Sequence, residues 1–272
     1  WLPTSKLVHV RPGEFYGHYN GLASSKRYPN GGYRSRYLRN GESPPAVWLP
    51  QNEISNSPTT PLEINKGPFA GQFYLSELTM GGIRRVQLEE VDGEMQGVVF
   101  RFTQGLESGV NRLIWGPDGC LYAGGMGSSG NWSWNDTRFG LQRLRPTEEE
   151  VFEIHSVHVQ PDGFEIKFTK PVDATWLANP HHYQLRQWRY HATAQYGGPK
   201  RHEQRLVATQ AHASADRRSV RLSVPGLREG SVVHFRMDPQ TVTGEELWSK
   251  EAWYTLNRIP GSSPAVEVDL TA

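Results

Sequence analysis

The strongest constraint on the fold is a series of short, alternating apolar segments separated by turn residues. Within Ile83–Val91, Val86 and Leu88 share one face and Arg85 and Gln87 the other, and within Val98–Phe102 the residues Val98, Phe100 and Phe102 share one face. Between the two segments stands Asp92-Gly93, a dipeptide typical of two-residue hairpin turns. The pattern predicts an antiparallel β-hairpin.

Further predicted strands flank this hairpin. Gln72–Leu78 precedes it, and Val110–Trp115 and Cys120–Ala123 follow it. Between the last two, Gly116-Pro117-Asp118-Gly119 predicts a tight turn, because proline presets its own φ and glycine supplies a positive φ. About four strands within 40–50 residues is typical of one β-propeller blade. Residues 1–147 would then hold about three blades, fewer than a closed propeller needs.

The composition changes around Pro146, where three glutamates follow, and we expect a domain boundary there. Beyond it, strand candidates recur at the spacing of a β-sandwich. They are Val151–Val159, Phe164–Phe168, His182–Tyr190, Ser219–Val224 and Val232–Met237. The sequence therefore predicts an all-β chain: a partial propeller over residues 1–147, an immunoglobulin- or fibronectin-like β-sandwich over residues 148–258, and a linker or tail over residues 259–272.

Charge and cysteine content narrow the classes of partner. The 29 Lys and Arg residues nearly balance the 28 Asp and Glu residues, which argues against a nucleic-acid partner. No stretch approaches the roughly 18 apolar residues of a membrane span. Cys120 is the single cysteine, so neither an intrachain disulfide nor a thiolate metal cluster can form. The chain starts at Trp1, which suggests a mature product or a piece of a longer polypeptide.

Several motifs carry a family resemblance. They are Gly67–Gln72, Gly81–Val86, Phe100–Leu106, Gly116–Tyr122, Phe139–Leu144 and Trp253–Asn257. Together they resemble the late blades of sugar-dehydrogenase-like propellers, the glucose and sorbosone dehydrogenase relatives that use pyrroloquinoline quinone (PQQ). The closer resemblance is to large multi-module secreted proteins of planctomycete-type bacteria, and it spans nearly the whole chain.

The resemblance implies the C-terminal portion of a secreted or periplasmic, quinone-dependent sugar or alcohol dehydrogenase. In the complete protein it implies PQQ and calcium as cofactors, with further propeller blades and a c-type cytochrome module as partners. The catalytic histidine of such enzymes comes from earlier blades, so the catalytic residues are expected outside this chain. The haem attachment motif is absent here, because it needs two cysteines.

Two groups of residues are candidates for binding. Arg84 and Arg85, with Asn111 on a later strand, could hold an anionic cofactor or substrate, although arginines on strands are more often solvated. Trp132 and Trp134 lie among amides and a carboxylate, a composition typical of sugar platforms. Packing of their loop against a blade edge is the alternative.

The histidines do not predict a metal site. His181 and His182 would point to opposite faces of a strand, and His155 and His158 also differ in face. Two functions therefore stay open. One is the oxidoreductase portion described above, and the other is a non-catalytic carbohydrate- or protein-binding module of a multi-module secreted protein.

Overall fold

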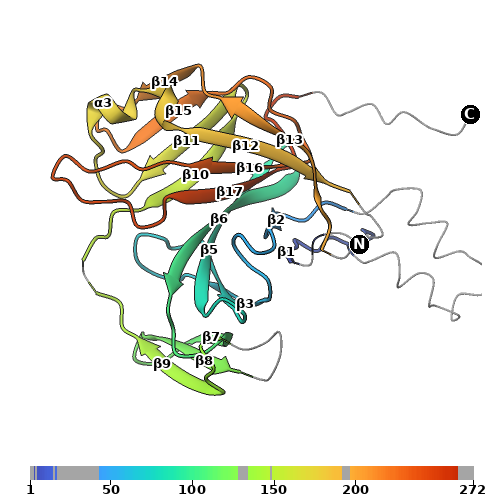
Figure 1. Ribbon diagram of the computed structural model, residues 1–272, viewed down its shortest axis with the longest axis vertical. Helices are drawn as coiled ribbons and strands as arrows, with labels where there is room; N and C mark the ends of the chain where they lie inside the picture. The colour runs from blue at the N-terminus through green and yellow to red at the C-terminus, as the bar shows by residue number, and fades with distance from the viewer. Residues whose placement is uncertain are drawn as a thin grey trace, which may run out of the picture.

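The computed structural model describes residues 3, 5–14, 16, 43–127, 134–147, 149–191 and 197–262 (Figure 1). The chain is all-β, as predicted, and is built from antiparallel sheets. Its described helices are single turns, α3 (Ala174–Leu177) and η1 (Pro180–His182). No helix in these ranges is long and apolar enough to cross a membrane.

The largest sheet has eight strands in the order β13-β12-β16-β17-β6-β5-β4-β3. In chain order they are β3 (Pro58–Glu63), β4 (Phe73–Glu77), β5 (Gly82–Val91), β6 (Glu94–Gln104), β12 (Gln184–Tyr190), β13 (Lys200–Val207), β16 (Ser231–Arg236) and β17 (Glu251–Leu256). The predicted hairpin joins β5 to β6, and Asp92 and Gly93 both have positive φ, 49° and 82°. Positive φ at both central residues is what a type I′ turn requires.

A second sheet of four strands packs against one face of the first (Figure 1). Its order is β10-β11-β15-β14, with β10 (Ile154–Gln160), β11 (Gly163–Phe168), β14 (Gln210–Ala213) and β15 (Ser219–Ser223). The main core lies between the two sheets. Phe164 of β11 contacts Phe235 and Tyr254 of the large sheet edge to face, with ring centroids 4.9 and 5.2 Å apart.

The opposite face of the large sheet is covered near its middle by an N-terminal segment. This segment includes β1 (Lys6–Leu7) and β2 (Val47–Trp48), which pair with each other. Val47, Leu49 and Ile54 are buried there against Val99 and Trp253. Strand β6 is therefore buried on both faces, since Val98 and Phe100 face the main core.

A small sheet of three strands, β7 (Val110–Trp115), β8 (Leu121–Met126) and β9 (Phe139–Leu144), lies at the end of β3 and β4 (Figure 1). Its inner face buries Leu113, Leu121 and Ala123 against Tyr74 and Ile83. The predicted turn between β7 and β8 is present, because Gly119 has a φ of 73° and donates its N–H to Gly116 O at 2.9 Å.

The expected boundary near Pro146 falls in the connection between β9 and β10, and the large sheet continues across it. Strand β6 from the first half pairs with β17 from the second, with Val99 opposite Trp253 and Val98 opposite Tyr254. None of the sheets formed by the described residues closes on itself. The all-β class is confirmed. The finer prediction, three propeller blades followed by an immunoglobulin-like sandwich, stays a prediction.

Candidate functional site

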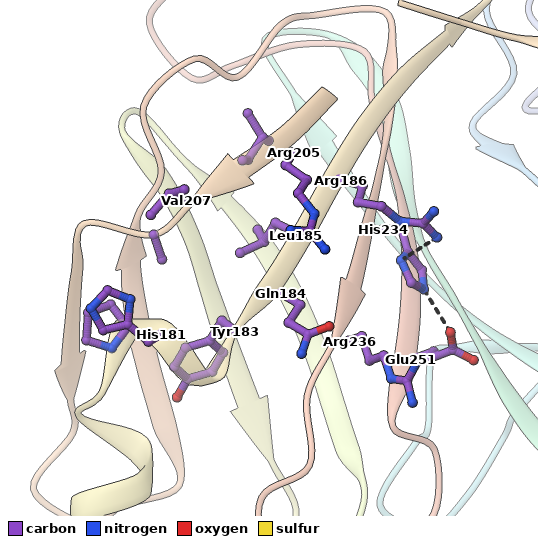
Figure 2. A pocket seen from close by; sticks show the side chains of 13 residues that line it. His181, Tyr183, Gln184, Leu185, Arg186, Arg205, Val207, His234, Arg236 and Glu251 are labelled. Carbon is purple, nitrogen blue, oxygen red and sulfur yellow. Dashed lines mark hydrogen bonds and ion pairs between the residues drawn. The ribbon is translucent and has the colours of Figure 1, made fainter. Parts of the chain in front are cut away.

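Polar side chains replace apolar ones where the N-terminal cover ends on the outer face of the large sheet. Successive residues of a strand point to opposite faces, so every second residue shares this face. On β12 the series runs Trp188, Arg186, Gln184, and on β16 it runs Val232, His234, Arg236. Trp188 and Val232 are buried under the cover. The side chains two and four positions along lie beyond it (Figure 2).

Two adjoining hollows occupy this end of the sheet. The larger, of about 550 Å³, is lined by side chains of β12, β13, β16 and β17 (Figure 2). The smaller, of about 280 Å³, lies over the ends of β6 and β17 and includes Trp248. Glu251 lines both hollows, and we call their combined surface the Glu251 groove. Its charged, amide, imidazole and indole side chains are Arg101, Gln104, His181, Gln184, Arg186, Arg205, His234, Arg236, Trp248, Lys250 and Glu251.

A row of hydrogen bonds across four neighbouring strands forms the floor of the groove. Arg186 Nη2 lies 3.3 Å from His234 Nδ1, and His234 Nε2 lies 3.0 Å from Glu251 Oε1 (Figure 2). Arg101 Nη1 donates to the other oxygen, Glu251 Oε2, at 2.6 Å. The bond with His234 has the largest effect on the pKa of Glu251; burial opposes it, the bond with Arg101 adds to it, and the net result is a pKa lowered to about 2. The carboxylate is therefore ionised at neutral pH.

Arg205 and Arg236 lie outside the hydrogen-bonded floor of the groove. Arg205 and Arg236 are exposed, and neither guanidinium group forms a hydrogen bond or an ion pair with any residue that the structure describes. Arg186 instead donates from Nη1 to Glu203 Oε1 at 3.1 Å. The groove thus presents unpaired guanidinium groups beside a neutralised floor.

Trp248 stands at the far end of the groove with 63 % of its surface exposed. Its indole Nε1 donates to the carbonyl of Phe102 at 2.9 Å. Phe102 is passed over in the β5–β6 register, where Ile83 pairs with Thr103 but Arg84 pairs with Arg101. Such a bulge re-aims the backbone locally. The ring is therefore held in a fixed orientation while its surface stays open to solvent.

The structure buries both arginines that were candidates for an anionic cofactor. Arg84 and Arg85 lie on β5 with 0 % and 1 % of their surfaces exposed. Arg84 donates from Nε to the carbonyl of Ile54. The expectation of solvated strand charges is wrong here, because the sheet is covered on both faces. Burial lowers the pKa of each guanidinium to about 10.

Arg85 ties the large sheet to β10. Its guanidinium donates to the carbonyls of Ile154 and His155 and to the side chain of Gln72. It also stacks on two rings, with its central carbon 4.0 Å from the centre of Phe69 and 4.3 Å from that of Phe100. These contacts make Arg85 a packing residue whose donors are already used.

Two other predicted site residues, Asn111 and Trp134, do not join the groove. Asn111 lies on β7, where its carbonyl accepts from Thr59 Oγ1 at 2.6 Å. Trp134 donates its indole N–H to Leu106 O at 3.1 Å and packs so closely on Gly81 that a Cβ there would lie 2.0 Å from Nε1. These are the contacts expected of a packing role. Trp132 lies outside the described residues.

Three of the four histidines that were considered as metal ligands form side-chain hydrogen bonds. His155 Nε2 lies 2.9 Å from Pro68 O, and His158 Nδ1 lies 2.8 Å from Glu89 Oε2. His182 Nδ1 lies 2.9 Å from Trp176 O. His181 is exposed at the rim of the larger hollow. In the parts of the chain that the structure describes, no three His, Cys, Asp or Glu side chains are grouped to hold a metal ion.

Sequence reasoning named none of the arginine, amide, indole or carboxylate side chains of the Glu251 groove as site residues. The alternation within Gln184–Tyr190 and Ser231–Arg236 carried part of the signal, because each strand changes from apolar to charged along one face. Trp248 had no local signal, since it precedes β17 as an isolated aromatic residue.

Comparison with protein-family models, curated proteins and solved structures found no match to this chain. The geometry of the groove therefore carries the functional argument.

Proposed function

We propose that this chain is a non-catalytic carbohydrate-binding module whose ligand lies in the Glu251 groove. The observation that carries the proposal is the exposed, hydrogen-bonded ring of Trp248 beside a row of charged side chains. Sugars present apolar C–H faces to aromatic rings and hydroxyl groups to polar side chains. The groove offers both kinds of contact along one surface.

The floor of the groove is organised before a ligand arrives. Arg186, His234, Glu251 and Arg101 hold one another in place across β12, β16, β17 and β6. Each Glu251 oxygen has a second lone pair that can accept a sugar hydroxyl. Side chains that are already ordered lose little entropy on binding, which favours affinity.

A binding role fits the groove better than glycoside hydrolysis. Most glycoside hydrolases use two carboxyl groups, one of them protonated as a general acid. Glu251 is the one carboxylate among the described residues that line the two hollows. Its pKa of about 2 keeps it ionised, so it cannot donate a proton to a leaving group at neutral pH.

A screen of the purified chain against immobilised glycans tests the proposal. We expect at least one glycan class to bind, with Trp248→Ala weakening that binding. Isothermal titration with the best oligosaccharide then gives the affinity of each variant. Absence of binding to every glycan, or binding that Trp248→Ala leaves unchanged, would overturn the proposal.

The oxidoreductase portion is the second candidate function. The order β6-β5-β4-β3 is a four-stranded antiparallel meander and β7-β8-β9 is a three-stranded one, and propeller blades have this local topology. This supports the proposal of blades followed by a sandwich in a secreted or periplasmic dehydrogenase-like protein. Arg84 and Arg85 do not fit a cofactor role, however, because their guanidinium groups are buried and bound within the fold.

Dye-linked sugar oxidation distinguishes the two candidates. The longest native polypeptide that contains this chain would be assayed with added PQQ and calcium. Sugar-dependent dye reduction would support the oxidoreductase function. Inactivity of that polypeptide with bound quinone would leave the binding module as the function of this chain.

A further inference from the structure

Positive charge exceeds negative charge along the Glu251 groove. Its lining includes five cationic side chains, Arg101, Arg186, Arg205, Arg236 and Lys250, and one carboxylate, that of Glu251. The chain as a whole has a formal net charge of only +1. The excess is therefore a local property of this surface.

Most of these cations already have partners. Arg101 is paired with Glu251 and Arg186 with Glu203. Lys250 Nζ lies 2.7 Å from Asp238 Oδ1, and this carboxylate raises the pKa of Lys250. Glu251 on the floor thus neutralises Arg101, and Glu203 and Asp238 at the rim neutralise Arg186 and Lys250.

Arg205 and Arg236 are left without a partner among the described residues. Arg205 lies opposite Arg186 on the neighbouring strand, and Arg236 lies between Gln184 and Glu251 in register. β13 and β16 are separated by one strand, so the backbones of Arg205 and Arg236 lie about 10 Å apart across the sheet and two residues apart along it. A ligand that crosses the strands would meet both guanidinium groups.

We infer that the glycan held in this groove is anionic, with carboxylate or sulfate groups that Arg205 and Arg236 bind. This inference rests on the proposed carbohydrate-binding function. A guanidinium group matches the two oxygens of a carboxylate or sulfate with two parallel N–H donors. A neutral sugar would leave both arginines without an oppositely charged partner.

A polysaccharide fits these features better than single-stranded nucleic acid does. Proteins that bind single strands combine a basic channel with several rings on which successive bases stack. The described lining of the Glu251 groove offers one well-exposed indole, that of Trp248. One stacking platform followed by spaced arginines suits a sugar chain with charged groups at intervals.

Matched pairs of oligosaccharides test the inference by isothermal titration. An oligogalacturonate is compared with its methyl ester, and a sulfated galactan oligosaccharide with its desulfated form. We expect the charged member of at least one pair to bind about tenfold or more tightly, with an affinity that falls as salt rises. The pair that shows this difference identifies the anionic group as carboxylate or sulfate.

The double variant Arg205→Ala/Arg236→Ala should lose about tenfold in affinity for the charged oligosaccharide and little for its neutral partner. Arg145→Ala, which removes an exposed arginine just after β9, should change neither affinity. A thermal melt of each variant establishes that the fold is intact.

Three outcomes would overturn the inference. Equal affinity for charged and neutral partners with dependence on Trp248 would reject the anionic ligand and keep the carbohydrate-binding function. Binding to no oligosaccharide would reject both. Tighter binding to a single-stranded oligonucleotide than to any oligosaccharide would assign the groove to nucleic acid.

Discussion

The indole N–H of Trp248 donates a 2.9 Å hydrogen bond to the carbonyl of Phe102, which fixes an exposed ring to a central strand of the large sheet. Phe102 is the residue that the β5–β6 register passes over. A local irregularity in one strand therefore sets the orientation of an aromatic platform that belongs to another part of the chain. This arrangement distinguishes Trp248 from an aromatic side chain that is exposed only by chance.

Replacing Trp248 with alanine should weaken glycan binding about tenfold, because one stacking contact contributes about 1–1.5 kcal/mol. Titration calorimetry of the two proteins measures the change. Phe139→Ala is the matched control, since Phe139 is 79 % exposed but lies on β9 in the small sheet. Equal losses in the two variants would show that general surface hydrophobicity, not the groove, holds the ligand.

Arg85→Met should cost about 2–5 kcal/mol in the free energy of unfolding, because each buried acceptor left without a donor costs about 1–3 kcal/mol. Methionine fills the space but leaves the carbonyls of Ile154 and His155 without their donors. Urea denaturation measures the change, and Arg145→Met is the exposed control. A loss below about 1 kcal/mol would contradict the proposed tie between β5 and β10.

Glu153 should make stability depend on pH. Burial raises the pKa of its carboxyl group to about 7, with the nearby charge of Arg85 acting in the opposite direction. A raised pKa means that the folded state binds the proton more tightly than the unfolded state does. The contribution of Glu153 to the free energy of unfolding is therefore fully present below pH 4.5 and is lost as pH rises through 7. From pH 4.5 to above 7 the loss is about 3 kcal/mol.

The variant Glu153→Gln should flatten this dependence and be more stable than the native chain at pH 8. Urea denaturation at pH 5 and pH 8 measures the difference for each protein. Glu149→Gln, at an exposed position, should retain the native pH dependence. If Glu153→Gln also retained it, another group would be responsible.

Gly81→Ala should destabilise the chain more than Gly105→Ala does. Both glycines have positive φ, 52° and 77°, so each substitution strains the backbone. A Cβ at Gly81 would also collide with the indole of Trp134, whereas a Cβ at Gly105 would meet nothing within 4 Å. The difference in melting temperature isolates the contact with Trp134, and equal shifts would argue against it.

Local sequence patterns predicted the hairpins well, because their causes are local. Asp92-Gly93 adopts the positive φ values that such a turn needs, and Val110–Trp115 is a strand with those bounds. Strand β13 was not predicted, because half of the residues in Lys200–Val207 are charged and the sequence does not alternate regularly. Only its pairing with β12 defines it as a strand.

Local sequence patterns could not predict which segments distant in the sequence pack against one another. Arginines are mostly exposed, so nothing in Arg84-Arg85 indicated that both would be buried. Their burial depends on covers supplied by distant segments, with Ile54 on one side and β10 on the other. The Glu251 groove forms in the same way, since Arg101 and Glu251 are 150 positions apart in the sequence.

The pairing of β6 with β17 also has a consequence for the order of synthesis. A ribosome completes β6 long before β17 emerges, and at about 5–20 residues per second the wait is on the order of ten seconds. During that time one edge of β6 has no neighbour, and unpaired edges favour aggregation. The nascent chain would then gain from a chaperone that shields β6 until translation reaches its partner strand.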